Sequence, residues 1–274
     1  KPYRNWYPIG EGKINFTKAI ARSNNIVFYK LGYRLYKKFK GKKLVETARE
    51  YGLGKKTGID LPNEKSGLVP DGDWKKEKYG ESWYPGDSVN LSIGQGRLLT
   101  TPLQLSVMLS SIANNGKVYK PQVVDKIVNE KGETIKNFEP IVKKELSFSK
   151  ETYDILMQGM REVTNAKYGT ASSIFGDFPV EIAGKTGTAQ TGISNHGWFG
   201  GIAPAEDPEI ALVVFIENGN SSSNTLSVAK GIFREYFGLD DTEQEIVDYS
   251  TIVEQYKTET NKLFDFFHSV FLEE

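Results

Sequence analysis

Residues 180–217 read VEIAGKTGTAQTGISNHGWFGGIAPAEDPEIALVVFIE. Three stretches of this segment, 180–190, 197–203 and 209–217, have the length and the apolar or β-branched content of strands. Only short turns separate them, and consecutive strands joined by short turns pair in antiparallel fashion. A helical pattern over 225–237 follows. The segment therefore predicts an α+β fold, in which an antiparallel sheet is flanked by helices.

The sequence upstream contains several helix starts. Asn15 is suited to cap a short helix over 16–22. Thr101, with Gln104 three residues later, has the pattern of a capping box. Ser149 has the position of a cap for the helix that precedes the predicted sheet. We therefore expect helices to begin at these points.

Two further segments have turn-rich sequences. Residues 54–90 are rich in Gly, Pro, Asp and Lys, so we expect a long, loop-dominated connection there. Residues 123–128 and 133–138 flank the turn Glu130-Lys131-Gly132. This second arrangement predicts a β-hairpin.

Composition excludes several classes of protein. The chain has 274 residues, enough for a sizeable core, and its 26% of charged residues is typical of globular proteins rather than of disordered chains. Cys is absent, and the two histidines, His196 and His268, are far apart in sequence. Thiol chemistry, disulfides and multi-His metal sites are therefore excluded. The longest apolar run, 210–216, is too short to cross a bilayer.

Charge is unevenly distributed along a chain that has 35 basic and 35 acidic residues. Residues 1–80 hold 19 Lys and Arg against 8 Asp and Glu, a net of +11, whereas residues 239–274 hold 2 against 10, a net of −8. We expect one domain over residues 1–238 and an acidic tail over 239–274 whose apolar residues dock on the basic N-terminal third; the alternative is a frayed tail that contacts a membrane or nothing. The overall balance argues against a nucleic-acid partner.

The strongest chemical signal is the run AGKTGTAQ at residues 183–190. It is not a phosphate-binding loop, because it lacks the first glycine of that loop and continues as a strand. On a strand, Lys185 offers a positive charge, and Thr186 and Thr188 offer hydroxyl groups. Gly187 lets a ligand approach the strand edge closely, and the N–H of Thr188 is suited to bind an oxyanion.

In serine penicillin-recognising enzymes, a Lys-Thr-Gly run acts together with a Ser-x-x-Lys and a Ser-x-Asn. Ser-x-Asn triplets begin here at Ser23, Ser88 and Ser222. Ser23-Asn24-Asn25 alone among them stands at a helix break with a helix after it and far upstream of Lys185. We therefore take Ser23 and Asn25 as the second motif.

Further landmarks follow in a fixed order: TGIDLP at 57–62, IGQG at 93–96, TPLQ at 101–104 and HGWFGGIAP at 196–204. On these motifs, about residues 6–237 resemble the C-terminal part of the transpeptidase domain of class B penicillin-binding proteins. The ending FIENG at 215–219 favours the elongation type, penicillin-binding protein 2. The resemblance implies the β-lactamase/transpeptidase-like fold, here incomplete at its N-terminal side.

The resemblance also implies an activity. It is that of a peptidoglycan D,D-transpeptidase, which cross-links stem peptides by serine acyl transfer and is a target of β-lactam antibiotics. The implied catalytic residues are Ser23, Asn25, Lys185 and Thr188, and the implied substrate-binding residues are Thr186, Gly187 and Thr188. Ser23 would relay protons, Asn25 would orient the substrate amide, and the N–H of Thr188 would form half of the oxyanion hole.

The same resemblance implies a setting for the reaction. It implies no cofactor and no metal ion. The expected partners are peptidoglycan stem peptides, β-lactams and a membrane glycosyltransferase of the elongation machinery. The expected location is the extracytoplasmic, periplasmic face of the cell membrane, with an anchor in a segment outside this chain.

One motif is missing where the family has it. The Ser-x-x-Lys that carries the nucleophile should precede Ser23, and no such run lies between residues 1 and 23. The runs at 147–150 and 227–230 are better explained as a helix start, with Ser149 as its cap, and as part of the final helix. We therefore expect the nucleophile outside this chain. Two alternatives stay open: a related D,D-carboxypeptidase or β-lactamase, and a non-catalytic β-lactam-binding sensor or degenerate transpeptidase.

Overall fold

The computed structural model describes residues 3–192 and 194–239. Its helices are α1 (Phe16–Ala21), α2 (Asn25–Phe39), α3 (Lys42–Glu50), α4 (Gly72–Tyr79), α5 (Pro85–Leu91), α6 (Pro102–Ala113), α7 (Lys150–Asn165), α8 (Ser172–Phe175) and α9 (Ser223–Tyr236). Its strands are β1 (Lys117–Lys120), β2 (Lys126–Val128), β3 (Thr134–Asn137), β4 (Ile141–Glu145), β5 (Ala183–Ala189), β6 (His196–Ala203) and β7 (Ile210–Ile216). The order of elements confirms the predicted α+β class.

The predicted antiparallel sheet is present, with the strand order β5-β6-β7. The β5–β6 pairing runs from Ala183 opposite Ile202 to Ala189 opposite His196, which places Lys185 opposite Gly200. β5 begins at Ala183, three residues later than the sequence predicts. Within this sheet β5 is an edge strand, so one side of the Lys-Thr-Gly strand is left unpaired by β6.

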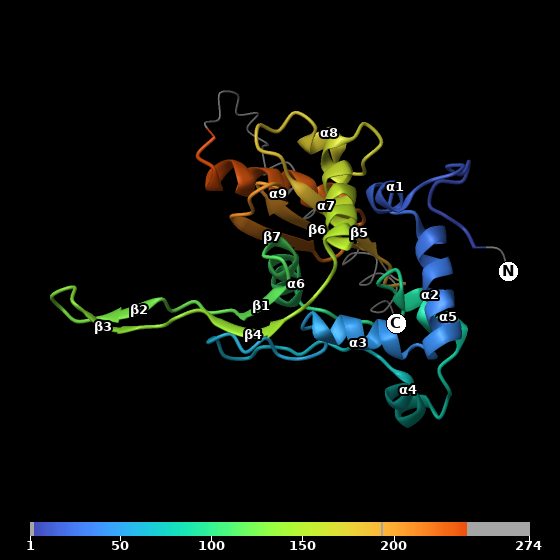
Figure 1. Cartoon of the computed structure of the whole chain (residues 1–274), viewed down its shortest axis with the longest axis horizontal. Helices are drawn as coiled ribbons and strands as arrows, with labels where there is room; N and C mark the ends of the chain where they lie inside the picture. Colours follow the sequence, from blue (N-terminus) through green and yellow to red (C-terminus); the bar gives the residue numbers. More distant parts are fainter. Residues whose placement is uncertain (1–2, 193, 240–274) are drawn as a thin grey trace, which may run out of the picture. The chain divides into compact units, whose positions relative to one another are not determined.

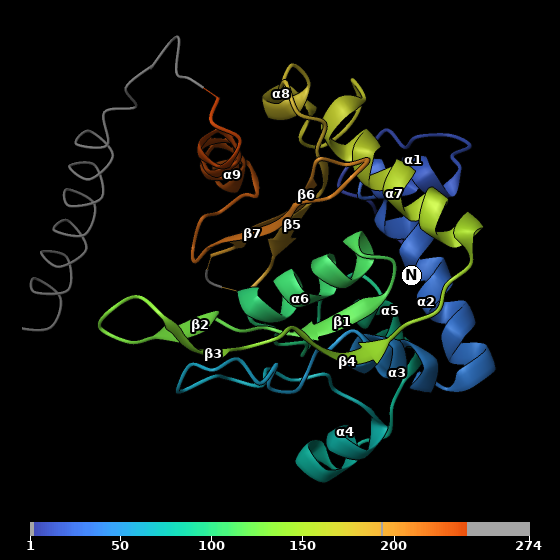
Figure 2. The ribbon, with the colours of Figure 1, turned by 60° about the vertical axis from the view of Figure 1, so that its left-hand side comes forward.

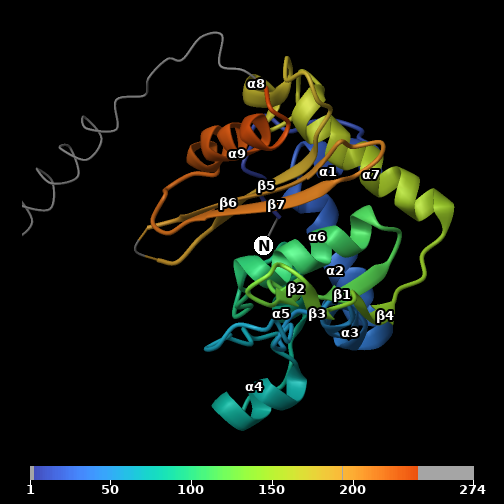
Figure 3. The ribbon, with the colours of Figure 1, turned by 90° about the vertical axis from the view of Figure 1, so that its left-hand side faces the viewer.

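Helices cover both faces of the sheet (Figure 3). α7 packs on β5, while α6 packs on β6 and β7 from the opposite face. Glycines let these layers approach closely: a Cβ at Gly200 would lie 2.7 Å from Leu109 of α6. Phe175 and Phe199, both buried, stack with ring centroids 5.3 Å apart in the layer on the α7 side.

The predicted helix starts are confirmed. The side chain of Asn15 accepts a hydrogen bond from the N–H of Lys18 at 2.8 Å and so caps α1. Thr101 and Gln104 form both bonds of a capping box at the start of α6. Ser149 caps α7 by accepting from the N–H of Thr152. Because α1 packs against α7 and α6 packs against the sheet, these caps fix where the helices that surround the site begin.

The expectation of a loop-dominated segment over 54–90 is wrong where α4 and α5 lie. Asp71 caps α4 by accepting from the N–H of Trp74 at 2.8 Å, and Asp87 accepts from the N–H of Tyr84 at 2.7 Å at the start of α5. Each helix has only two turns, and α4 has no buried residue. An apolar stripe is therefore absent from α4, and without one a periodicity argument finds no helix.

The predicted hairpin is present as β2 and β3, but it is only the outer part of a longer arm (Figures 1 and 2). The inner part of the arm is the antiparallel pair β1–β4, which the sequence did not predict. This pairing runs from Lys117 opposite Glu145 to Lys120 opposite Ile141. Every residue of β2, β3 and β4 is exposed. Strands without a buried face have no strong alternation of apolar and polar residues, which explains why β4 escaped prediction.

The chain divides into residues 1–233 and residues 234–274. Of the second part the structure describes the end of α9 and the residues up to Leu239. The predicted acidic tail and its docking therefore lie outside the described residues from residue 240 onward. No helix in the described ranges is long and apolar enough to span a membrane.

Candidate active site

Ser23 lies in a tight turn between α1 and α2. Its φ of 47° is in the left-handed region, which few non-glycine residues adopt. The N–H groups of Ser23 and Asn24 donate to the carbonyls of Ile20 and Ala19, at 3.0 and 2.9 Å. Asn24 then caps α2 by accepting from the N–H of Val27 at 3.2 Å. The predicted helix break is thus confirmed, and it holds Ser23 in one defined backbone conformation.

The ion pair between Glu11 and Arg22 stabilises this turn. Glu11 accepts from Arg22 Nε at 2.7 Å and from Asn24 Nδ2 at 3.2 Å, so one carboxylate binds the residues on both sides of Ser23. The Glu11 side chain is only 6% exposed. The Arg22 guanidinium also donates to the carbonyl of Tyr168 at 2.8 Å and lies over the ring of Trp6. Sequence analysis missed this cluster, because its members are close only in the folded chain.

The Lys-Thr-Gly strand and the Ser-x-Asn turn, 162 residues apart, meet through Lys185. Its Nζ donates a hydrogen bond to Ser23 Oγ and another to the carbonyl of Thr186 at 2.8 Å. Burial lowers the pKa of Lys185 from 10.5 to about 8. An amine with this pKa, in direct contact with a serine hydroxyl, is suited to proton transfer near neutral pH.

The open edge of β5 is formed by main-chain groups of Thr186 and Thr188. Their carbonyls accept from Lys185 Nζ and from Gln95 Nε2, at 2.8 and 3.3 Å, and not from the neighbouring strand. In a strand, the N–H and C=O of one residue point toward the same edge, and alternate residues repeat that direction. The N–H groups of Thr186 and Thr188 therefore also face the open edge.

The two threonine hydroxyls are less favourably placed than their main-chain groups. Thr186 is buried, and its Oγ1 shares a 2.7 Å hydrogen bond with Oγ1 of Thr170. Because successive side chains of a strand alternate between faces, Thr186 projects from the opposite face to Lys185. Thr188 is exposed, and its Oγ1 accepts from the N–H of Ser222 at 3.3 Å. Gly187 lies between them opposite Trp198, where an added Cβ would be 3.3 Å from the Trp198 Cβ.

Asn25 is the first residue of α2 and is half-buried. Its N–H donates to the side-chain oxygen of Asn5 at 3.1 Å. Asn25 therefore lies two residues from Ser23 at a fixed helix start. The structure brings Ser23, Asn25 and Lys185 into one region, with Thr188 further along the same strand as Lys185.

Gln95 is a contact residue that sequence analysis did not single out. It belongs to the IGQG turn after α5 and donates to the Thr188 carbonyl, so it joins this turn to the edge of β5. The IGQG motif is distinctive, but nothing in its sequence alone assigns a role to Gln95. Among the described residues, no cluster of three or more His, Asp or Glu could hold a metal ion.

The other candidate serines have structural roles. Ser88 is buried in α5, where its Oγ accepts from the indole N–H of Trp83 at 2.8 Å. Ser222 is in the loop before α9. In the first Ser-x-x-Lys run Ser149 is a helix cap and Lys150 pairs with Asp154, and the second run lies within α9. Of the three Ser-x-Asn triplets, the one at Ser23 is therefore the one in contact with Lys185.

Comparisons with known proteins agree with this geometry. Among curated proteins, the peptidoglycan D,D-transpeptidase MrdA of Haemophilus influenzae is 29% identical over 276 residues, which cover 94% of this chain and 41% of the relative. MrdA of Acinetobacter baumannii is 34% identical over 84% of this chain and 36% of the relative. The chain thus spans about two fifths of the length of these relatives.

Solved structures give the same result. Penicillin-binding protein 2 of Helicobacter pylori is 35% identical, with a TM-score of 0.75 over 86% of this chain and 42% of that one. Penicillin-binding protein 2 of Pseudomonas aeruginosa, solved with WCK 5153, is 32% identical, with a TM-score of 0.77 over 90% and 53%. The predicted resemblance to penicillin-binding protein 2 is therefore confirmed. The family model of the penicillin binding protein transpeptidase domain matches residues 1–238, and the chain belongs to this family.

Proposed function

We propose that this chain supplies the Ser-x-Asn and Lys-Thr-Gly parts of a peptidoglycan D,D-transpeptidase of the elongation type. The observation that carries the proposal is the contact between Lys185 and Ser23, two residues that the fold brings together from opposite parts of the sequence. The names of the MrdA relatives add support. The protein would cross-link stem peptides by serine acyl transfer and be acylated by β-lactams in the same site.

The reaction has two half-steps. A serine hydroxyl attacks the carbonyl carbon of the D-Ala–D-Ala bond; the new C–O bond forms, the C–N bond breaks, and the departing amine of the last D-Ala takes up a proton. The amine of a second stem peptide then attacks the ester carbonyl, loses a proton and releases the serine. Both transfers need a group that passes protons to and from an amine, and the Ser23–Lys185 pair fits this role.

The open edge of β5 fits the substrate. The N–H of Thr188 would donate to the oxyanion that forms during each attack, a contact that typically contributes about 10²–10³-fold in kcat. The charge of Lys185, the hydroxyl of Thr188 and the main-chain N–H of Thr186 would hold the terminal carboxylate of the stem peptide, which Gly187 lets approach the strand. Asn25 would orient the amide on the acyl side.

The nucleophile must come from a different Ser-x-x-Lys. We place it outside these 274 residues, because Ser149 and Lys150 serve the start of α7 and the run at 227–230 is part of α9. The chain covers about two fifths of its curated relatives, which leaves ample sequence for that motif.

Partners and location follow from the same proposal. One solved relative is a complex between penicillin-binding protein 2 and MreC from Helicobacter pylori, and another is titled as a peptidoglycan synthase complex that coordinates polymerization and crosslinking. We propose a membrane glycosyltransferase partner for this protein, and a position at the extracytoplasmic face of the cell membrane. The reaction requires no metal or cofactor.

The test is acylation of the full-length protein by a labelled penicillin. Lys185→Ala should slow acylation by about hundredfold or more, because it removes the group that contacts Ser23. Its unfolding free energy should not fall by more than about 1 kcal/mol below the parent value, because the substitution also removes the cost of burying the Lys185 ammonium. The acylation rate is measured by quenching the reaction at a series of times and quantifying the labelled protein by in-gel fluorescence. The unfolding free energy is measured by denaturant titration.

Lys131→Ala, at the exposed turn of the β2–β3 hairpin, is the matched control and should acylate at the parent rate. Mass spectrometry of the parent adduct locates the nucleophile. An adduct on Ser147 or Ser227, or an unchanged rate in Lys185→Ala, would overturn the assignment. A protein that is acylated but never transfers the acyl group of a stem peptide to an acceptor amine would instead be a β-lactam sensor.

A further inference from the structure

A second path of contacts, separate from the bond between Lys185 and Ser23, connects the Ser-x-Asn turn with the Lys-Thr-Gly strand. It begins at Arg22, the residue before Ser23, and passes through residues 166–171, which follow α7. It ends at Thr186, the residue after Lys185. The ends of this path are therefore the direct neighbours of the two residues whose side chains meet in the site.

Four contacts fix the guanidinium of Arg22. Its Nε donates to Glu11 at 2.7 Å, and its Nη1 donates to the carbonyl of Tyr168 at 2.8 Å. The ring centroids of Trp6 and Tyr7 lie 4.8 and 5.3 Å from it. The side chain is only 17% exposed. A planar fork that binds two acceptors and is covered by rings keeps one orientation, so Arg22 sets the distance from its own backbone to Tyr168.

The segment 166–171 is held tightly on the end of α7. The N–H of Ala171 donates to the carbonyl of Val163 at 2.9 Å. A Cβ at Gly169 would lie 2.2 Å from the carbonyl oxygen of Glu162, so the backbone at this glycine lies directly against the helix. A displacement at one end of such a segment is passed to its other end, because the segment has little room to bend.

Thr170 completes the path to the strand. Its Oγ1 shares a 2.7 Å hydrogen bond with Oγ1 of Thr186, which is buried on β5. The carbonyl of Thr186 in turn accepts from Lys185 Nζ at 2.8 Å. The residue that receives the path is therefore also the one whose main chain holds the lysine amine.

The backbone of Ser23 depends on the start of this path. Its φ of 47° lies in a region that residues other than glycine keep only where their surroundings impose it. Glu11 binds both Arg22 and Asn24, the residues on either side of Ser23. Without these bonds the turn has more favourable backbone conformations available, and each of them would move Ser23 Oγ away from Lys185 Nζ.

We propose that Arg22 is a positioning residue for proton transfer: held by Glu11 and linked through Tyr168 and Thr170 to Thr186, it fixes the separation of Ser23 Oγ and Lys185 Nζ. The inference rests on the proposed function. Proton transfer between a hydroxyl and an amine requires hydrogen-bond contact, and a misplacement of about 1 Å costs on the order of hundredfold in rate. Because Arg22 acts through Ser23, its loss should slow acylation without weakening the complex that precedes it.

The test measures how the acylation rate of the full-length protein depends on the concentration of a labelled penicillin. The fit gives k2, the first-order rate constant of acylation, and K, the dissociation constant of the noncovalent complex. Arg22→Gln should lower k2 by about tenfold to hundredfold and leave K within about threefold of the parent. A smaller folded fraction lowers the final yield of adduct but not k2.

Arg22→Lys is the milder variant and keeps the test available if Arg22→Gln does not fold. It retains the charge beside Glu11 but replaces the planar fork with a single ammonium. Its k2 should fall by about threefold to tenfold, with K again unchanged.

Thr170→Val tests the far end of the path, because it keeps the shape of the side chain and removes the hydroxyl that binds Thr186. Alone, it should lower k2 by about threefold. Combined with Arg22→Gln, it should lower k2 by less than about twofold further, because the bond to Thr186 no longer positions Ser23 once Arg22 is lost. Such non-additivity is the signature of residues that act together.

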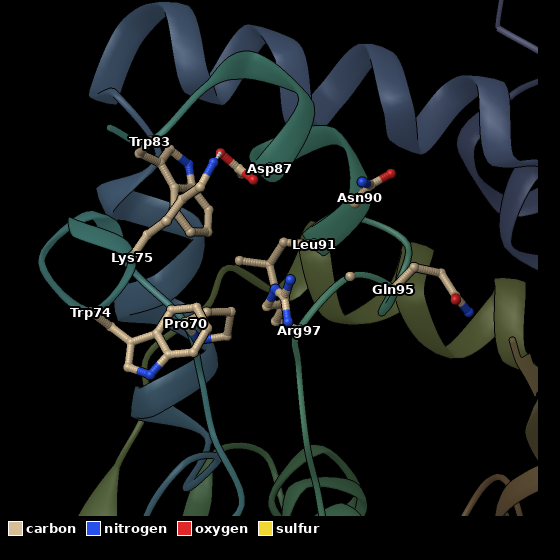
Figure 4. Close-up of a pocket in the computed structure, with 10 residues that line it drawn as sticks. Pro70, Trp74, Lys75, Trp83, Asp87, Asn90, Leu91, Gln95 and Arg97 are labelled. Carbon is tan, nitrogen blue, oxygen red and sulfur yellow. Dashed lines mark hydrogen bonds and ion pairs between the residues drawn. The ribbon is translucent and has the colours of Figure 1, made fainter. Parts of the chain in front are cut away.

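The control is Lys75→Gln, which breaks an ion pair of similar burial elsewhere. Lys75, on α4, is 13% exposed and lies 2.7 Å from Asp87, on the wall of a pocket of about 180 Å³ (Figure 4). Its other contacts are with Glu81 and the ring of Tyr84. Loss of this cation should leave both k2 and K within about twofold of the parent.

Three results would overturn the positioning role. In the first, the Arg22 variants keep the parent k2 and only the yield of adduct falls, which would mean that the ion pair supports folding alone. In the second, K rises while k2 is unchanged, which would place Arg22 in ligand binding. In the third, the effects of Arg22→Gln and Thr170→Val multiply, which would mean that the two links act separately. A parent protein that penicillin does not acylate would overturn the proposed function itself, whereas an acylated parent leaves that function standing whatever the variants do.

Discussion

The sheet β5-β6-β7 and the arm made by β1, β4, β2 and β3 are both antiparallel, but they differ in burial and regularity. In the sheet, the β5–β6 register is continuous, and Phe199 and Ile202 are fully buried between helices. In the arm, the register shifts in both strand pairs, and Ile135 is 66% exposed. The same type of pairing is therefore supported by packing in the sheet and by little besides hydrogen bonds in the outer pair of the arm, β2–β3, where every residue is exposed.

This difference shows why the motif residues lie on the sheet. Proton transfer and oxyanion binding require atoms held to a fraction of an ångström. Lys185 reaches Ser23 because β5 is fixed by α7 on one face and by its partner β6, while Ser23 is fixed by the Glu11–Arg22 pair. The outer pair β2–β3, which is exposed throughout, has no comparable support, and this suits it to contact or spacing rather than to chemistry.

Matched isoleucine substitutions in the sheet and in the arm should differ most in their cost to stability. Ile202→Ala removes a fully buried side chain from β6 and should lower the unfolding free energy by about 2–5 kcal/mol. Ile135→Ala makes the same chemical change in β3 of the arm and should cost less than about 0.5 kcal/mol. Denaturant titration of both variants in the full-length protein gives the two values. Equal costs would mean that the arm packs as tightly as the sheet.

An intermediate effect concerns the buried charge on the sheet. Because the pKa of Lys185 falls to about 8 on folding, the unfolded chain binds more protons than the folded one between pH 8 and 10.5. The unfolding free energy should therefore rise with pH across this window, by on the order of 1–3 kcal/mol relative to Lys185→Met. Below pH 8 the two proteins should show parallel pH dependence.

Carbon-13 labelling of the lysine ε-carbons measures the same property directly. The resonance that disappears in Lys185→Met should titrate with a midpoint near pH 8 in the parent. A midpoint near the ordinary lysine value would show that the ammonium is well solvated, and the stability difference should then vanish.

Much of the buried region could be predicted from sequence, for physical reasons that apply residue by residue. The strands β5, β6 and β7 have the apolar and β-branched content of buried strands, and the caps at Asn15 and Thr101 depend on side chains a few residues away. The site motifs were readable because Ser23 and Lys185 each sit in a short, distinctive run. Features that depend only on residues close together in the sequence can be predicted without knowledge of the tertiary structure.

The remaining features depend on contacts between distant residues. Glu11 becomes important only once Arg22 and Asn24 lie against it, and Gln95 only once α5 and β5 are neighbours. The helix α4 lacks a buried face, so its sequence has no apolar period. The pairing of β1 with β4 joins segments about 25 residues apart, of which β4 is fully exposed. None of these features can be predicted from a short stretch of sequence taken by itself.

Removal of the outer part of the arm should have little effect on stability or on acylation. The N–H of Phe138 donates to the carbonyl of Asp125 at 2.9 Å, so residues 126–137 can be replaced by Asn-Gly, a pair that closes a two-residue hairpin. The base of the arm is joined to the 54–70 segment by hydrogen bonds from the N–H groups of Val123 and Val124 to Asp60 and from Lys143 Nζ to the carbonyl of Thr57, and the replacement retains them. Because β2 and β3 are exposed throughout, the unfolding free energy should change by less than about 1 kcal/mol. Penicillin acylation should stay within about twofold of the parent, whereas a tenfold loss would show that the arm positions the site after all.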